Sequence, residues 1–170
     1  MSIRNKYEAE LSQVFDRLVT MCRETERAID RSVSALVRRD PELSRAVIDE
    51  DKNIDRLEHE IEQDCLKILL MEHPVASDFR DVSAALKMIT DLERIADQAA
   101  DISEIALQFG NEKYIKEPEH IAEMARLATA MVKDSVESYI NRDVELARSL
   151  DGRDDRVDEL FETVKRDLVA

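Results

Sequence analysis

Two pairs of acidic residues have a spacing that could support chemistry. Asp51 and Asp55 are four residues apart, and so are Glu93 and Asp97. Side chains four residues apart lie on one face of a helix, close enough to share a cation. Because the donors are oxygens, hard cations such as iron, manganese, magnesium or calcium are favoured over a structural zinc. The spacing therefore predicts a metal site.

Each pair begins on a helical stripe, a series of positions three or four residues apart that is otherwise apolar. Asp51 follows Val47 by four residues, and Glu93 follows Ile89 by four. Ionised carboxylates on neighbouring helix faces repel one another and lose hydration, which is costly unless they are neutralised or bind a cation. A bound metal ion would remove this cost.

The two pairs should also lie at the same height in a helical hairpin. Their midpoints, residues 53 and 95, are each 21 residues from Pro74, which is expected to break the helical pattern. An antiparallel hairpin that turns there brings the four acids together. Asp101 would extend the second pair by one turn.

A solvated acidic face is the alternative interpretation. An acidic residue four positions before an aspartate occurs seven times in this chain. Spacing alone therefore does not identify a site. The stripe positions and the equal height raise these two pairs above the others, and the sequence leaves both interpretations open.

The elements that hold these residues are predicted to be helices. The 170 residues are 38% charged and 4% aromatic, with two Gly and three Pro, which favours an all-α fold. Helices are expected over 5–39, from Pro41 to the break at Pro74, from Ser77 to Gly110, over 119–142 and over 144–170.

Charge and hydropathy limit the partners and the location. A net charge of −14 argues against nucleic acid and anionic membranes, because both are bound by clustered Lys and Arg. The N-terminus has no apolar signal region, and no run of 18 apolar residues occurs. We expect a cytoplasmic protein that meets membranes only through partner proteins, with Cys22 and Cys65 as reduced core thiols.

The chain contains an internal repeat. Shifting the sequence by 103 aligns 32–66 with 135–169 without a gap, and the two RDxEL turns coincide. The repeat predicts two helical units joined by a linker. The first unit has three helices over 1–109, the linker is 110–118, and the partial second unit has two helices over 119–170. A third helix of the second unit is expected and is missing, so self-association is predicted through exposed apolar residues Val136, Ile140, Leu146, Leu150, Val157 and Leu160.

Several segments resemble the PhoU family of phosphate-uptake regulators. They are DKNIDRLEHEIEQDCLKIL, PVASDFRDVSAALKMITDLERIADQAADI and the second DDRVD. The resemblance covers nearly the whole chain, which looks shortened at its C-terminal end. It implies tandem three-helix bundles with iron or zinc at Asp51, Asp55, Glu93 and Asp97, and at Asp154 and Asp158 of the second repeat.

The resemblance also implies a function. Family members are metal-binding negative regulators of phosphate uptake and of the phosphate-starvation response, acting between the phosphate ABC transporter and a sensor histidine kinase, without catalysis. Two alternatives stay open. One is a carboxylate-bridged di-metal enzyme, which usually needs imidazole ligands and an open coordination position. The other is a metal-free helical scaffold with solvated acids.

Overall fold

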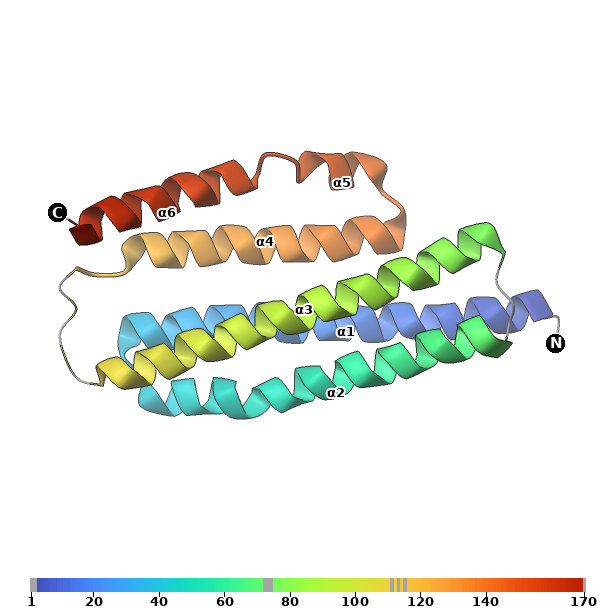
Figure 1. Ribbon diagram of the computed structural model, residues 1–170, viewed down its shortest axis with the longest axis horizontal. Helices are drawn as coiled ribbons and strands as arrows, with labels where there is room; N and C mark the ends of the chain where they lie inside the picture. The colour runs from blue at the N-terminus through green and yellow to red at the C-terminus, as the bar shows by residue number, and fades with distance from the viewer. Residues whose placement is uncertain (1–2, 72–74, 111, 113, 115, 170) are drawn as a thin grey trace.

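The computed structural model describes residues 3–71, 75–110, 112, 114 and 116–169, and the all-α prediction is confirmed within them. No described helix combines the length and the apolar character needed to cross a membrane. Figure 1 shows long helices lying side by side along one axis. Their bounds are α1 Ile3–Arg38, α2 Pro41–Met71, α3 Ala76–Phe109, α4 Glu119–Asn141, α5 Val144–Ser149 and α6 Asp154–Val169.

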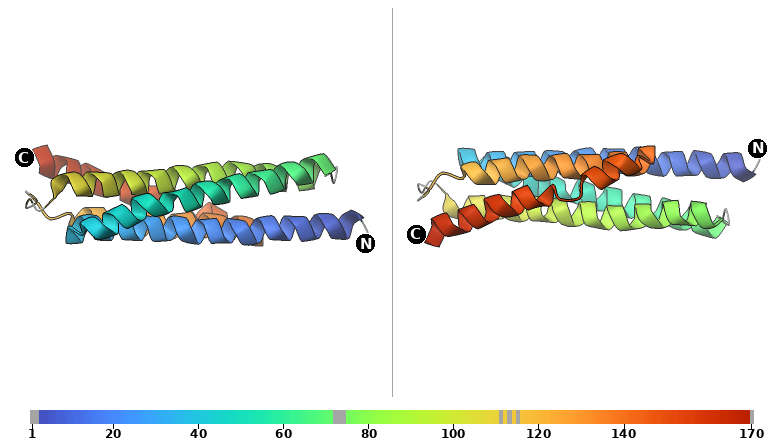
Figure 2. Two further views of the ribbon diagram at one scale, coloured as in Figure 1. Left: turned by 90° about the horizontal axis from the view of Figure 1, so that it is seen from below. Right: turned by 90° about the horizontal axis from the view of Figure 1, so that it is seen from above.

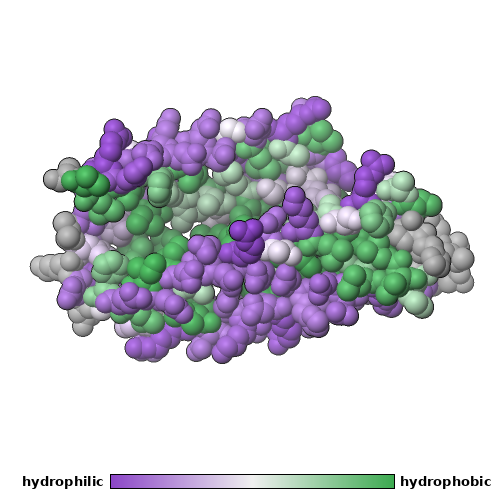
Figure 3. Space-filling model, viewed as in Figure 1, coloured by the Kyte–Doolittle hydropathy of each residue, from purple (hydrophilic) through white to green (hydrophobic). Residues whose placement is uncertain are grey.

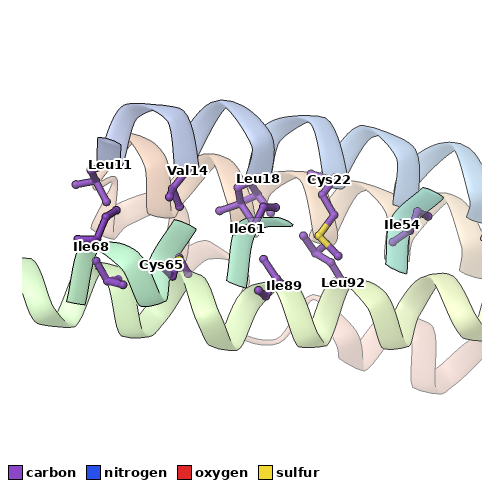
Figure 4. Packing of buried hydrophobic residues seen from close by; sticks show 14 of the residues in the cluster. Leu11, Val14, Leu18, Cys22, Ile54, Ile61, Cys65, Ile68, Ile89 and Leu92 are labelled. Carbon is purple, nitrogen blue, oxygen red and sulfur yellow. The ribbon is translucent and has the colours of Figure 1, made fainter. Parts of the chain in front are cut away.

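Helices α1, α2 and α3 lie alongside one another (Figure 2) and share an apolar core. Each contributes a stripe of apolar side chains with helical spacing, so one face of every helix is removed from water. Figure 4 shows side chains from the three helices meeting in the centre, with Leu18 above Ile61 and with Ile89 nearby. All three are fully buried. This core holds the α2–α3 hairpin that carries the acidic pairs.

Helix α4 packs against α1 and adds to the same core. Its Val136 is buried there, and the ring of Tyr139 meets Phe15 edge to face, with centroids 5.5 Å apart. The Tyr139 hydroxyl donates a hydrogen bond to the Asp81 carbonyl at 2.6 Å, and Arg142 pairs with the Asp81 carboxylate at 2.7 Å. These contacts tie the end of α4 to the beginning of α3.

The predicted single helix over 144–170 is wrong, because the structure divides it into α5 and α6. The break contains Gly152, whose φ of 78° lies in the left-handed region that favours glycine. Asp151 and Arg153 form turn hydrogen bonds to Arg148 and Leu150 instead of continuing the helix. The repeat concealed this break, because the residue equivalent to Gly152 is Asp49, which lies within the unbroken helix α2.

The predicted exposure of apolar residues in the second half is also partly wrong. Val136 and Leu160 are buried, at 4% and 3% exposure, because α4 packs against α1 and α6 packs against α4. The remaining four residues of that prediction are half-buried: Ile140, Leu146, Leu150 and Val157. The apolar surface left to drive self-association is therefore smaller than expected.

The turns before α2 and α5 are built alike, as the repeat predicts. The Asp40 carboxylate accepts a hydrogen bond from the Leu43 backbone N–H at 3.0 Å, and the Asp143 carboxylate accepts one from Leu146 at 2.9 Å. Both aspartates cap a helix N-terminus by satisfying a donor that lacks a partner within the helix. The predicted division at 110–118 coincides with the connection between α3 and α4 and remains a prediction as a domain boundary.

Candidate metal centre

The seam between α2 and α3 positions the acidic pairs. Ile54 and Ala96 point into the core and are 3% and 1% exposed, which leaves the acids beside them at the edge of the seam. The Thr90 hydroxyl of α3 donates a hydrogen bond to the Glu58 carboxylate of α2 at 3.2 Å. Residues 58 and 90 are equidistant from 74, so the register of this contact agrees with the predicted hairpin, although Pro74 itself lies outside the described residues.

Three of the predicted acids converge across the seam. One carboxylate oxygen from each of Asp51, Asp55 and Asp97 lies within 4.8 Å of the other two. Asp51 is half-buried, whereas Asp55 and Asp97 are exposed. A cation placed among these oxygens would have ligands from both helices and would remain open to solvent on its other side.

Partial burial and, after it, repulsion between carboxylates at this seam raise the pKa of Asp51. Partial burial is the largest cause, because it disfavours the charged form, and the negative charges of Asp55, Asp97 and Asp101 add to it. The carboxylates therefore lie close enough to destabilise one another when no cation is present.

The fourth predicted acid, Glu93, lies at the edge of the group rather than within it. Its pKa is raised by desolvation first, then by the charges of Asp97, Glu58, Asp55 and Asp51. Glu93 thus shares the electrostatic field of the group but does not meet the 4.8 Å separation of the other three. A longer glutamate side chain can reach toward a cation by changing rotamer.

The donors at the seam fit a hard cation. Carboxylate oxygens are the ligands that magnesium, manganese, calcium and iron accept most readily, and Asp51, Asp55 and Asp97 supply three of them. The basic residues adjacent in sequence to these acids contact other carboxylates: Lys52 lies 4.0 Å from Asp49, Arg56 lies 3.9 Å from Glu60, and Arg94 lies 3.9 Å from Asp91.

The structure adds Glu58 to the residues predicted from the sequence. Glu58 acts on Glu93 through its charge and accepts the Thr90 hydrogen bond across the seam. It follows Asp51 by seven residues, which is two helical turns, so a search at that spacing would have found it. Asp101 acts on Asp51 through its charge and accepts a hydrogen bond from Gln98 at 3.3 Å.

The acids predicted in the second repeat lie elsewhere. Asp154 and Asp158 are exposed at the beginning of α6, where they line a groove together with Asp91 of α3. Within the described part of the chain they are not members of a group of three close ligands. As a metal site, this pair remains a prediction.

Comparison with known proteins places this helical arrangement in a family. The model of the PhoU domain matches residues 18–106 and 121–170, which include the α2–α3 seam and α6. A phosphate-specific transport system accessory protein PhoU homolog from Aquifex aeolicus is 35% identical over 161 residues, covering 95% of this chain and 73% of that protein. A homolog of the same name from Clostridium acetobutylicum is 30% identical, covering 98% of this chain and 76% of that protein.

A solved structure has the same fold. The crystal structure of PhoU from Pseudomonas aeruginosa superposes with a TM-score of 0.91 at 29% identity, covering 96% of this chain and 78% of that one. The match of the family model to most of the chain and the superposition on a solved PhoU structure agree with one another. The chain therefore belongs to the PhoU domain family.

Proposed function

We propose that this chain is a metal-binding accessory regulator of phosphate transport. The observation that carries the proposal is the convergence of Asp51, Asp55 and Asp97 across the α2–α3 seam of a PhoU domain. The transport role is supported by the relatives, which are named phosphate-specific transport system accessory proteins. Their names describe an accessory role, which favours regulation over catalysis.

The carboxylates of the seam would hold the metal. Asp51, Asp55 and Asp97 would supply ligand oxygens, with Glu93 as a further ligand after a rotamer change. Desolvation and, after it, repulsion raise the pKa of Asp51 and Glu93; a bound cation would neutralise that repulsion and would link α2 to α3. Iron or zinc is suggested by the family resemblance, and manganese or magnesium also suits the oxygen donors.

The proposed regulatory role is that of an adaptor. Long helices offer extended faces to partner proteins, and a metal that links two helices fixes the shape of one such face. The partners we propose are the phosphate ABC transporter and a sensor histidine kinase, with the chain acting as a negative regulator of phosphate uptake and of the starvation response in the cytoplasm.

Metal analysis tests the site. The purified protein is dialysed without chelator and its iron, zinc and manganese are measured beside the Glu93→Ala/Asp97→Ala variant. We expect stoichiometric metal in the unmodified protein and its loss from the variant. The matched control is Asp151→Ala/Asp155→Ala, which removes two acids of the same spacing from an exposed region and should retain metal.

Equal metal contents in the two variants would contradict the site. Circular dichroism distinguishes a lost ligand from a lost fold, because a folded variant keeps its helical signal. The regulatory role has a separate test in a bacterium that lacks its own PhoU and expresses a phosphate-starvation reporter. The chain should restore repression at high phosphate, and normal expression of folded protein without repression would contradict the role.

A further inference from the structure

The turn between α5 and α6 contains the one Asp–Gly pair in the sequence, Asp151–Gly152. Figure 1 shows the chain leaving its helical path between these two helices. Both residues are exposed. Figure 3 shows mostly hydrophilic side chains along the edge of the molecule that α5 and α6 form. Water therefore reaches two groups that can react with each other, the carboxyl of Asp151 and the amide nitrogen of Gly152.

Neither of these groups has a partner that would hold it in place. Asp151 and Arg153 donate backbone hydrogen bonds to Arg148 and Leu150, but the Gly152 N–H donates none among the described residues. Among the same residues, the Asp151 carboxylate forms no hydrogen bond or ion pair. Gly152 has a φ of 78° and no Cβ, so no side chain of its own shields its nitrogen.

The exposure of this turn follows from its place on the helix pair. By the repeat, Gly152 corresponds to Asp49 of α2. Asp49 is exposed although α3 packs along α2 in the first half. The position therefore faces away from the side on which a third helix packs, and the accessibility of the turn does not depend on what covers the groove beside α6.

The helices on either side hold the turn weakly. Helix α5 has six residues and no buried side chain, and the buried side chain of α6 is Leu160. Segments with few buried contacts open locally at a low cost in free energy. The backbone at Asp151 can therefore reach the geometry in which the Gly152 nitrogen approaches the carboxyl carbon of Asp151.

We propose that Asp151 is a site of spontaneous isomerisation to isoaspartate. The Gly152 nitrogen attacks the carbon of the protonated Asp151 carboxyl, and the carboxyl hydroxyl and the amide proton leave as water, which closes a succinimide ring. Water then adds to one of the two ring carbonyls. Opening at the side-chain carbonyl restores aspartate, whereas opening at the main-chain carbonyl leaves the chain running through the side-chain carbon. One water leaves and one returns, so no oxidant or other reactant is needed.

The product changes the connection between α5 and α6. It adds one carbon to the main chain of the turn and leaves a free carboxylate on the Cα of residue 151. That carboxylate is the group that a protein isoaspartate methyltransferase esterifies, with S-adenosylmethionine as the methyl donor. Carboxyl methylation is therefore the class of reaction that would consume the product.

Ageing of the full chain tests the proposal. The protein is kept at neutral pH and physiological temperature for several weeks, folded or in guanidinium chloride, and is then digested with trypsin. Cleavage after Arg148 and Arg153 releases Asp151 in the peptide SLDGR. Its isoaspartyl form has the same mass, a different retention time, and accepts a labelled methyl group from the methyltransferase. We expect the isomer to form in the folded chain at a rate within about tenfold of that in the unfolded chain.

Asp134 is the matched internal control, because a small residue, Ser135, also follows it. Both lie within α4, where backbone N–H groups bind carbonyls one turn earlier, and the Asp134 carboxylate accepts a hydrogen bond from Arg153. Asp134 should isomerise in guanidinium chloride and not in the folded chain.

Two variants assign the chemistry to the Asp–Gly pair. Asp151→Glu keeps the charge but would have to close a larger ring, so isomerisation at this position should be abolished. Gly152→Ala places a methyl group beside the attacking nitrogen, and the added Cβ would lie 3.6 Å from Asp155 Oδ2, an ordinary contact. Isomerisation should slow several-fold in this variant, with circular dichroism as the check on folding.

Three results would overturn the proposal. They are isomerisation at Asp151 more than about tenfold slower in the folded chain than in the unfolded chain, equal rates at Asp151 and Asp134 in the folded chain, and an isomer that persists in Asp151→Glu. The measurement needs neither metal nor a partner protein, so its outcome is independent of the proposed function.

Discussion

Equivalent positions in the two halves of the chain carry similar residues but differ in burial. Ile61 of α2 is fully buried, whereas its equivalent in α6, Val164, is half-buried. Ile54 and Val157 differ in the same way. The cause is α3, which covers α1 and α2 in the first half, while the apolar faces of α4 and α6 border an open groove. An apolar stripe therefore stabilises a helix only to the extent that another element covers it.

Truncation of equivalent core residues should give the largest difference between the halves. Ile61→Ala leaves a cavity among three helices and should lower the free energy of unfolding by about 2–5 kcal/mol. Val164→Ala removes a side chain that water already reaches and should cost less than about 1 kcal/mol. Urea unfolding followed by circular dichroism measures both. Similar losses in the two variants would show that the halves are packed equally well.

Removing the helix caps of α2 and α5 should give a smaller difference in stability between the two halves. Asp40→Ala removes the cap of α2, a 31-residue helix in the core, and should cost about 1 kcal/mol of global stability. Asp143→Ala removes the same hydrogen bond from α5, which has six residues and no buried side chain. We expect faster amide exchange in α5 with little change in the melting temperature. A global loss from Asp143→Ala equal to that from Asp40→Ala would contradict this contrast.

Substituting acids of the seam should change the free energy of unfolding least, and should raise it rather than lower it. The pKa values of Asp51 and Glu93 are raised in the folded protein, so the metal-free protein loses stability as pH rises through the window that begins at their ordinary carboxyl pKa values. Asp51→Asn/Glu93→Gln should therefore stabilise the metal-free protein at neutral pH by about 0.5–1 kcal/mol, since each like-charge pair removed contributes a few tenths.

Urea unfolding of chelator-treated protein between about pH 4 and pH 7 measures this change. The stabilisation should fade toward the acidic end, where the carboxyls of the unmodified protein are protonated. The control Asp151→Asn/Asp155→Asn removes two acids from the second half, leaves the seam intact, and should not reproduce the stabilisation. A variant that is less stable than the unmodified protein at neutral pH would mean that these carboxylates make favourable contacts in the metal-free fold.

Local patterns in the sequence were enough to predict most of the fold. The all-α class, the ends of α1 to α4 within a few residues, and the buried thiols Cys22 and Cys65 follow from apolar periodicity and from helix-ending residues. The break at Gly152 was missed because the repeat suggested continuity, although the glycine itself was a local signal of a turn. The burial of Val136 could not be predicted, because it depends on α4 packing across the first half.

The candidate site was also predicted only in part from the sequence. Spacing and equal distance from the hairpin turn predicted that Asp51, Asp55 and Asp97 meet, since those relations depend on helix geometry alone. The sequence did not indicate that Glu93 lies at the edge of the group, or that the charge of Glu58 acts on Glu93. That detail depends on the rotation of α2 and α3 about their axes and on side-chain rotamers, which the packing of the whole bundle decides.

The sequence by itself determined which faces of the helices are apolar, where most helices begin and end, and that two acidic pairs share one height. These properties depend on neighbours along the chain, and helical periodicity is enough to read them. Only the tertiary structure decided that α4 joins the core of the first half and that α3, α4 and α6 leave a groove between them. Such contacts join residues far apart in sequence, and the periodicity of one helix contains no information about which other helix will cover its apolar face.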